Sequence, residues 1–283
     1  MTEDAPGSTI AKRRLSRLLT ELRLDAGYTA NQVCDRLNWG RGKVGRFEAN
    51  QWVRPELSDI RDIARLYGQV DGDLAELENL AGLARRRAWW RDHSEVFSNE
   101  FCGFEADASA IRVLMPLVLP GLLQTPAYIQ CLMASGTRPA EWQSQAREAR
   151  LRRQAILNRD DGSAPTLTAL ITEASLMYRW GTPADRRAQV AHLAEMSRRS
   201  NIELRLLRFD NGPHPGMSTL VNIFDFPGNE PAMVYLENDA AIQEINEPKS
   251  VEDYVRIFSR VREAALSPEA TTDYLEEQTN KLE

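Results

Sequence analysis

Residues 29–48 read TANQVCDRLNWGRGKVGRFE, a stretch that predicts two short helices joined by a tight turn. Thr29 is a favoured N-cap residue and Gln32 stands three positions later, which is the capping-box pattern of a helix start. We expect this first helix to span residues 30–37. Asn38 then falls at the turn, where the left-handed conformation suits Gly best and Asn next best.

The second helix is expected over residues 41–48, after Trp39, which we expect in the core. Val44 and Phe47 lie one helical turn apart and would face inward. The outward positions of this helix are then Arg41, Gly42, Lys43, Gly45 and Arg46.

An outward face with two arginines and a lysine is suited to the major groove of double-stranded DNA. Arg can bond the O6 and N7 atoms of guanine together, and Lys can neutralise a phosphate. Two of the outward positions are glycines, each of which weakens a helix by about 1 kcal/mol. The alternative is an amphipathic surface helix with solvated charges, but the turn residues and the inward pairs agree with DNA binding.

This arrangement resembles the helix-turn-helix of the phage-repressor class, the XRE family. The match runs through Thr29, Val33, Cys34, Leu37, Asn38, Trp39, Gly40, Val44, Phe47 and Glu48. The resemblance implies base-reading positions at Arg41, Gly42, Gly45 and Arg46, and a backbone-contacting position at Lys43. In the loop that follows, Trp52 and Arg54 are further candidates for contact with the DNA backbone.

The distribution of charge agrees with a DNA-binding part joined to an acidic body. The net charge is −6, with 35 Lys and Arg against 41 Asp and Glu. Residues 1–70 hold 12 Lys and Arg against 9 Asp and Glu, which leaves 23 against 32 for residues 71–283. The three cysteines lack metal-type spacing and indicate buried thiols in a reducing compartment. We therefore expect a cytoplasmic, nucleoid-associated protein with no membrane span, no metal and no cofactor.

The length of 283 residues predicts two domains, because single cores seldom grow much beyond about 250 residues. About five helices complete a mainly α DNA-binding domain over residues 8–84. A junction over residues 85–91 contains the run Arg85–Arg87, which could touch phosphate but is more commonly a solvated helix end. The second domain is expected over residues 92–283.

The second domain is expected to be α+β with a small sheet. Helices are expected at 104–111, from Thr125 onward, and at 141–158, 184–200 and 251–266. Strands are expected at 166–171, 202–208, 219–226 and 232–236. The stretch from Ser267 is expected to form a short acidic helix and a frayed tail.

A second resemblance lies in this part of the chain, which is similar to the C-terminal domain of the WhiJ-like regulators of actinomycetes. It is carried by Trp89–Trp90, Glu105, Ala106, Ala108, Ile111, Leu119–Tyr128 with the motif PGLLQT, Arg153–Leu157, Glu173 and Leu266–Glu269. Such proteins are regarded as antitoxin-like transcriptional regulators, commonly encoded beside a small partner protein. The resemblance implies a partner of this kind and leaves any ligand of the domain open.

The sequence thus predicts a homodimeric regulator that binds an inverted-repeat operator and is controlled by a small protein partner. Candidate partner- or ligand-binding residues are Leu122, Gln124, Tyr128 and His214. One alternative is a one-component repressor whose second domain binds a small molecule in a pocket around residues 117–128. A lesser alternative is a DNA-targeted hydrolase or nuclease. No catalytic residue is expected, and Glu173 is interpreted as an acceptor for backbone or Arg donors.

Overall fold

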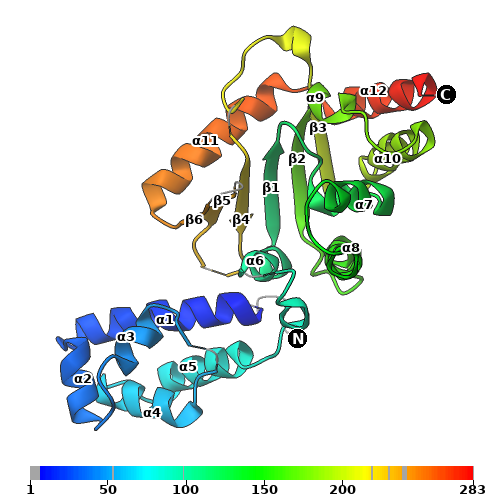
Figure 1. The fold of residues 1–283 in the computed structure, drawn as a ribbon. Coiled ribbons are helices and arrows are strands. Elements are labelled where there is room, and N and C mark those ends of the chain that lie inside the picture. The colour runs from blue at the N-terminus through cyan, green and yellow to red at the C-terminus, as the bar shows by residue number, and fades with distance from the viewer. Residues whose placement is uncertain are drawn as a thin grey trace. The chain divides into compact units, whose positions relative to one another are not determined.

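The computed structural model describes residues 7–52, 54–97, 99–217, 219–228, 230–237 and 241–282, apart from the side chain of Asp71. The chain divides into two compact units, Met1–Asp92 and His93–Glu283. The first unit is helical, and the second combines helices with a six-stranded mixed sheet (Figure 1). The predicted fold class, a helical helix-turn-helix part followed by an α+β part, is confirmed.

The first unit is built around apolar faces of its helices. These are α1 (Ser8–Asp25), α2 (Ala30–Arg36), α3 (Lys43–Glu48), α4 (Leu57–Leu66) and α5 (Asp71–Ala84), before the 3-10 helix η1 (Trp89–His93). Leu15 and Leu19 of α1 pack in one buried cluster with Val33 of α2, Phe47 of α3 and Ile60 of α4. Because each helix contributes to one core, the short helices α2 and α3 are held by packing rather than by their own propensity.

The sheet of the second unit has the strand order β3-β2-β1-β4-β5-β6. Its strands are β1 (Ala110–Met115), β2 (Thr166–Thr172), β3 (Ile202–Leu207), β4 (Val221–Asp225), β5 (Met233–Glu237) and β6 (Ile242–Ile245). Strands β1, β2 and β3 pair in parallel, while β4, β5 and β6 continue the sheet antiparallel from β1. The parallel half therefore needs helical crossovers, which the long segments after β1 and β2 supply.

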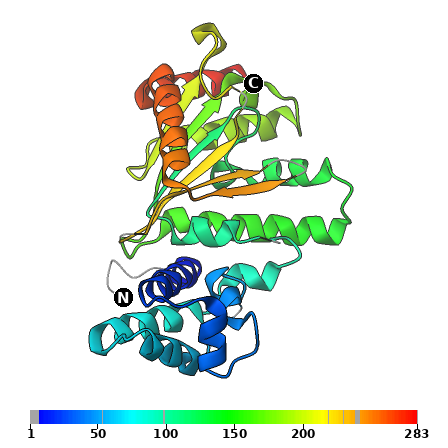
Figure 2. The ribbon, with the colours of Figure 1, turned by 90° about the vertical axis from the view of Figure 1, so that its left-hand side faces the viewer.

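Helices cover both faces of this sheet (Figures 1 and 2). Helix α11 (Pro248–Ala264) packs Phe258 and Val261 against Leu114 and Ile223 on one face. The opposite face carries α6 (Phe101–Asp107), α7 (Pro126–Ala134), α8 (Ala140–Gln154) and α10 (Pro183–Met196). Short 3-10 helices η2 (Gly121–Leu123), η3 (Ala155–Asn158) and η4 (Phe209–Asn211) and helix α9 (Glu173–Met177) lie in the connections.

Two expectations for the second unit were wrong in detail. The helix expected at 104–111 is α6, which ends at Asp107, and Ala110–Met115 is a central strand. The alternating burial of β1 is the strand pattern that the expected helix overlapped. Strand β6 was not predicted, because its residues are mostly exposed and carry little apolar pattern.

The C-terminal stretch was expected to form a short acidic helix and a frayed tail; the helix is present, and as α12 (Pro268–Lys281) it runs for 14 residues. Its Leu275 is completely buried, and the hydroxyl of Thr271 accepts a hydrogen bond from the backbone N–H of Leu206 in β3. Helix α12 packs along α10. The apolar face that anchors it is too narrow to stand out in an acidic sequence.

We predict that Leu275→Ala lowers the free energy of unfolding by about 2–5 kcal/mol, because it leaves a cavity against α10 and β3. The exposed neighbour Asp273 provides the control, and Asp273→Ala should change stability by less than about 0.5 kcal/mol. Urea unfolding of the full chain measures both. Equal, small effects of the two substitutions would mean that α12 is not anchored by Leu275.

Candidate nucleic-acid interface and a cavity in the second unit

The start of the first motif helix forms as the sequence predicts. The hydroxyl of Thr29 accepts a hydrogen bond from the backbone N–H of Gln32 at 3.3 Å, and the Gln32 side-chain oxygen accepts one from the Thr29 backbone N–H at 2.8 Å. Asn38 has a φ of 52°, in the left-handed region. The capping box and the Asn turn are both confirmed, and they fix where α2 begins and ends.

The second motif helix begins later than expected. It was predicted over residues 41–48, but α3 starts at Lys43, and Gly42 is its N-cap residue with a φ of 80°. A residue with positive φ cannot lie within a right-handed helix. Arg41 and Gly42 therefore belong to the turn that leads into α3, and only Lys43, Gly45 and Arg46 of the five candidates lie on the helix itself.

A largely buried ion pair fixes α3 on the rest of the unit. The Nε atom of Arg23 in α1 lies 2.5 Å from one carboxylate oxygen of Glu48, and a terminal nitrogen lies 3.1 Å from the other. The same guanidinium donates to the Tyr28 carbonyl at 2.7 Å. The hydrogen bond that Arg23 donates to the Glu48 carboxylate raises the pKa of Arg23. This two-pronged contact holds the C-terminal end of α3 against α1.

The candidate cations around α3 fall into two groups. Arg41 and Arg46 are exposed, and no described residue binds either guanidinium. Lys43 is held inside the unit: its ammonium nitrogen lies 2.7 Å from an Asp59 oxygen and 4.0 Å from the ring centroid of Trp39. The two arginines are therefore available to another molecule. Lys43 could contact another molecule only while it stays close to Asp59 and Trp39.

Trp52, expected along the DNA backbone, is half-buried and has its donor bonded within the unit. Its indole N–H donates to the Phe47 carbonyl at 3.1 Å and to the Ser16 hydroxyl at 3.2 Å. Its ring packs on Phe47 with 5.6 Å between centroids. Trp52 therefore closes the core beneath the loop after α3.

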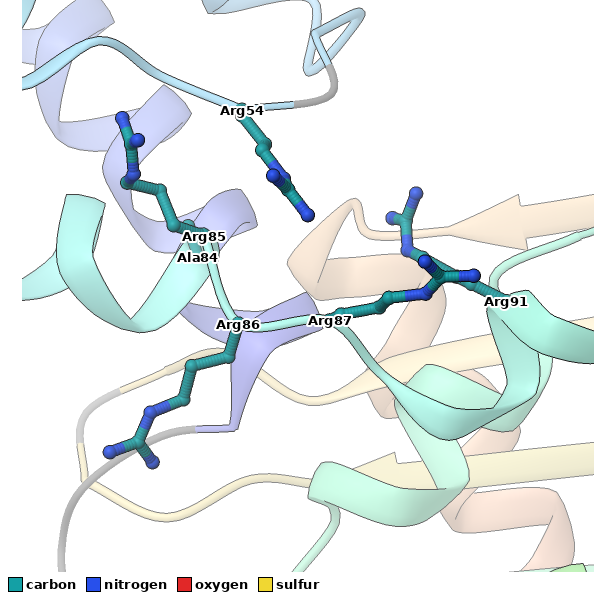
Figure 3. Close-up of a pocket in the computed structure, with 6 residues that line it drawn as sticks. All are labelled: Arg54, Ala84, Arg85, Arg86, Arg87 and Arg91. Atoms are coloured by element: carbon teal, nitrogen blue, oxygen red, sulfur yellow. The ribbon is translucent and has the colours of Figure 1, made fainter.

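Arg54, from the same loop, meets a cluster of arginines that follows α5 (Figure 3). With Ala84, five arginines line a cavity of about 230 Å³: Arg54, Arg85, Arg86, Arg87 and Arg91. Arg85 donates to the Pro55 carbonyl at 2.7 Å, which ties the run to the start of α4. Arg85 also pairs with Glu56 at 3.4 Å and Arg87 with Asp92 at 2.5 Å, whereas the side chains of Arg54 and Arg86 have no hydrogen bond or ion pair within the described chain. The arginine cluster therefore has guanidiniums available for an anion such as a phosphate.

In the second unit, the PGLLQT motif is a largely buried segment that hydrogen bonds hold in place. Of the partner- or ligand-binding candidates, Leu122, Gln124 and Tyr128 are each at most 5 % exposed, and Gln124 lines a cavity. The Gln124 side chain donates to the Leu119 carbonyl at 2.7 Å, and the Tyr128 hydroxyl accepts from the Leu119 N–H at 3.2 Å. Gln189 of α10 bonds the Leu123 carbonyl at 2.8 Å.

A buried ion pair packs against the PGLLQT segment. The Nε atom of Arg153 in α8 lies 2.8 Å from a Glu105 oxygen of α6, and both side chains are nearly inaccessible. The Arg153 guanidinium lies against Gly121, where any Cβ would overlap it. Gln154 donates to the carbonyls of Gly121 and Gln124. The motif residues far apart in sequence thus form one cluster, and Gly121 is required by the close approach of Arg153.

Beside this cluster lies a cavity of about 720 Å³. Its lining combines apolar side chains, including Phe101, Met115 and Trp142, with Arg150 and Asn222. Sequence reasoning missed Arg150 and Asn222, because nothing distinguishes one arginine of an Arg-rich helix or one polar residue of a buried strand. His214 lies elsewhere, in a loop after η4, where its ring Nδ1 is 2.9 Å from the Pro215 carbonyl.

Glu173 occupies the structural role expected of it. One carboxylate oxygen accepts from the Phe209 backbone N–H at 2.5 Å, and the other accepts from the Tyr274 hydroxyl at 2.8 Å.

Burial raises the pKa of the Cys102 thiol to about 12, so this cysteine is protonated at neutral pH. Among the residues described, no cluster of three or more His, Cys, Asp or Glu side chains could hold a metal ion.

The two glycines near α3 give opposite predictions. Gly45→Ala should stabilise the motif by up to about 1 kcal/mol, since it fills open space within a helix. Gly42→Ala should destabilise it by about 1 kcal/mol, because Gly42 is left-handed. Hydrogen exchange of peptides covering α2 and α3 in the full chain measures the local free energy of opening. Shifts of the same sign would contradict the assigned helix start.

Comparisons with known proteins agree with this division of the chain. Residues 14–77 match the family model described as "Helix-turn-helix domain", and residues 98–277 match the model described as "Domain of unknown function (DUF5753)". No curated protein and no solved structure matches the chain. No helix in the described ranges is long and apolar enough to cross a membrane. The helix-turn-helix match supports a DNA-binding regulator. The second match covers more than half of the residues of the chain, so the chain belongs to the DUF5753 family.

Proposed function

We propose that the protein is a sequence-specific transcriptional regulator of the XRE-like helix-turn-helix type, which binds double-stranded DNA as a homodimer. The observation that carries this proposal is the pair of exposed arginines, Arg46 on α3 and Arg41 in the turn before it, which have no partner among the described residues, together with the buried contacts that fix α3 in its unit. A rigid helix with free arginines fits the major groove. In this proposal residues 8–84 bind DNA, residues 85–91 form a junction, and residues 92–283 bind the effector and the second subunit.

The candidate residues take different roles in this proposal. Arg46, from α3, and Arg41, from the preceding turn, read base edges. Gly42 and Gly45 allow close approach of the backbone, and Lys43 contacts a phosphate from beside Asp59. Arg54 and the arginines after α5 bind phosphates further along the duplex, which positions the protein without reading sequence.

We further propose that the second unit regulates rather than catalyses. Glu173, the acid-base candidate that the sequence suggested, accepts hydrogen bonds from Phe209 and Tyr274. Its buried thiol, Cys102, has a raised pKa, and thiolate rather than thiol is the nucleophile. The chemistry on this unit therefore supports binding, and the cavity of about 720 Å³ has the size of a small-molecule site. A small-molecule effector is the form of regulation that this geometry supports best.

An antitoxin-like, WhiJ-like regulator with a small protein partner is the second candidate, and a specific observation favours it. Large apolar side chains are more than half exposed at Leu117, Met177, Tyr178 and Phe209. Exposed apolar patches commonly mark protein interfaces. Co-purification of the full chain with the product of the neighbouring small gene distinguishes this candidate: capture that is lost in Tyr178→Glu, with folding intact, would support it.

We predict distinct DNA phenotypes for the two classes of arginine. Arg41→Ala and Arg46→Ala should each cost about 1–3 kcal/mol on DNA enriched by in vitro selection and much less on random DNA. Arg54→Ala and Arg86→Ala should weaken both DNAs alike and reduce the salt slope by about one unit each. Fluorescence anisotropy over a salt series measures both effects. Equal losses on selected and random DNA for all four variants would overturn the base-reading assignment.

We also predict two-fold symmetry in the recovered DNA. Two copies of α3 would contact half-sites about one helical turn, 34 Å, or a multiple of it apart. Inserting about 5 base pairs between the half-sites should abolish tight binding, and inserting about 10 should restore part of it. Analytical ultracentrifugation should find two chains on each DNA. A single chain bound to a single half-site with full affinity would exclude the dimer.

A further inference from the structure

The cavity of the second unit is lined by both apolar and polar side chains, and the polar ones include the carboxylate of Glu237. Phe101 from α6, Met115 from β1 and Trp142 from α8 belong to the apolar lining. Arg150 and Asn222 lie among the polar lining residues. An apolar cavity with a few polar groups is the usual form of a site for a small organic molecule, and its volume of about 720 Å³ lies within the usual range.

Of the two arginines at this cavity, only Arg153 has its charge neutralised. Its Nε atom lies 2.8 Å from Glu105, and its guanidinium stacks above Phe101 at 5.5 Å from the ring centroid. Arg150 lies one helical turn earlier on α8. Within the described part of the chain its side chain has no hydrogen bond and no ion pair. Burial and the like charge of Arg153 lower the pKa of Arg150, while the carboxylates of Glu105 and of Glu237, which also lines the cavity, act on it only through space. Burying a guanidinium that has no hydrogen-bond or ion-pair partner costs folding free energy.

Asn222 is the second polar group without a partner. It is 5 % exposed, in the middle of the sheet between Val221 and Ile223, both of which are completely or almost completely buried. Its backbone pairs within the sheet, but no described residue bonds its side-chain amide. Buried side-chain amides are bonded in the large majority of cases. The side-chain oxygen of Gln124, which also lines the cavity, is likewise buried without a partner.

The three groups have complementary chemistry. Arg150 offers only donors, Asn222 offers donors and an acceptor, and the Gln124 oxygen is an acceptor. An anionic oxygen group satisfies the guanidinium and the Asn donors together, in the geometry that makes arginine a carboxylate and phosphate binder. The aromatic and aliphatic side chains of the lining suit an apolar body. Neither a neutral hydrocarbon nor a small inorganic anion matches both the polar and the apolar lining residues.

We propose that this cavity binds a small organic acid, in which an apolar and aromatic body carries one anionic oxygen group. Arg150 bonds the anionic group, Asn222 donates a second hydrogen bond, and Phe101, Met115 and Trp142 enclose the body. This ligand class refines the effector of the regulator proposed above and rests on that proposal for its biological consequence. Binding itself is independent of DNA and is tested without it.

The test uses two fluorescent probes of one shape, the anion anilinonaphthalene sulfonate and its neutral analogue N-phenyl-naphthylamine. The full chain should bind one anionic probe per subunit, and Arg150→Gln should weaken that binding about tenfold or more while changing the neutral probe little. Arg147→Gln is the matched control, because Arg147 is an exposed residue of the same helix that does not line the cavity. Equal loss of both probes, or no loss of either, would overturn the proposal.

A second variant keeps the test independent of folding defects. Asn222→Leu removes an unpartnered buried amide, so it should raise the melting temperature of the ligand-free chain while weakening the anionic probe severalfold. A structural role for Asn222 predicts the opposite change, a lower melting temperature. Aromatic carboxylates should displace the anionic probe, and the matching neutral amides should not.

Failure of this proposal and failure of the regulator proposal are separable. If Arg150→Gln and Asn222→Leu leave probe binding unchanged while the chain still selects a DNA sequence, the ligand class is wrong and the DNA-binding regulator stands. If the probes behave as expected but no DNA sequence is selected, the cavity is a ligand site and the regulator proposal fails.

Discussion

The ion pair between Glu105 and Arg153 is the contact on which the second unit depends. Neither side chain is accessible, so removal of one would leave the other charged and buried, at a cost of about 3–5 kcal/mol. The pair joins α6 to α8, and the Arg153 guanidinium packs directly against Gly121. Gln154 and Gln189 then bond the carbonyls of the same segment. The segment is rigid as a result, and it forms one wall of the cavity.

Two groups of charged side chains have different roles. Those in the first group pair with an opposite charge and stabilise the fold, and those in the second have no such partner and can bind another molecule. Arg23 with Glu48 and Lys43 with Asp59 hold the helix-turn-helix, as Arg153 with Glu105 holds the second unit. Arg41 and Arg46 outside, and Arg150 inside its cavity, have no such partner among described residues. An arginine that the fold does not use is available for an anion, and the two proposals, DNA at the first unit and an organic acid at the second, both rest on this distinction.

The parts of the fold that sequence reasoning predicted are those set by local chemistry. The Thr29 capping box, the left-handed Asn38 and strands β2 to β5 need only neighbouring residues to specify them, whereas the central strand β1 was not predicted. The start of α3 was missed because Gly42 could equally have continued a helix. The contacts of Trp52 and of the PGLLQT residues could not be predicted, because their partners, such as Ser16 and Gln189, lie far away in sequence. The cavity could not be predicted at all, since Arg150 and Asn222 meet only through tertiary packing.

The central claim is that free arginines on a fixed helix-turn-helix read a DNA sequence. Genome-wide recovery of DNA fragments bound by the protein, carried out side by side for the unaltered chain and for Arg46→Ala, tests it most directly. The account predicts a common inverted repeat in fragments recovered with the unaltered chain, and its loss or degeneration at one position in each half-site with the variant. Fragments that share no sequence, or an identical repeat recovered with both proteins, would contradict it.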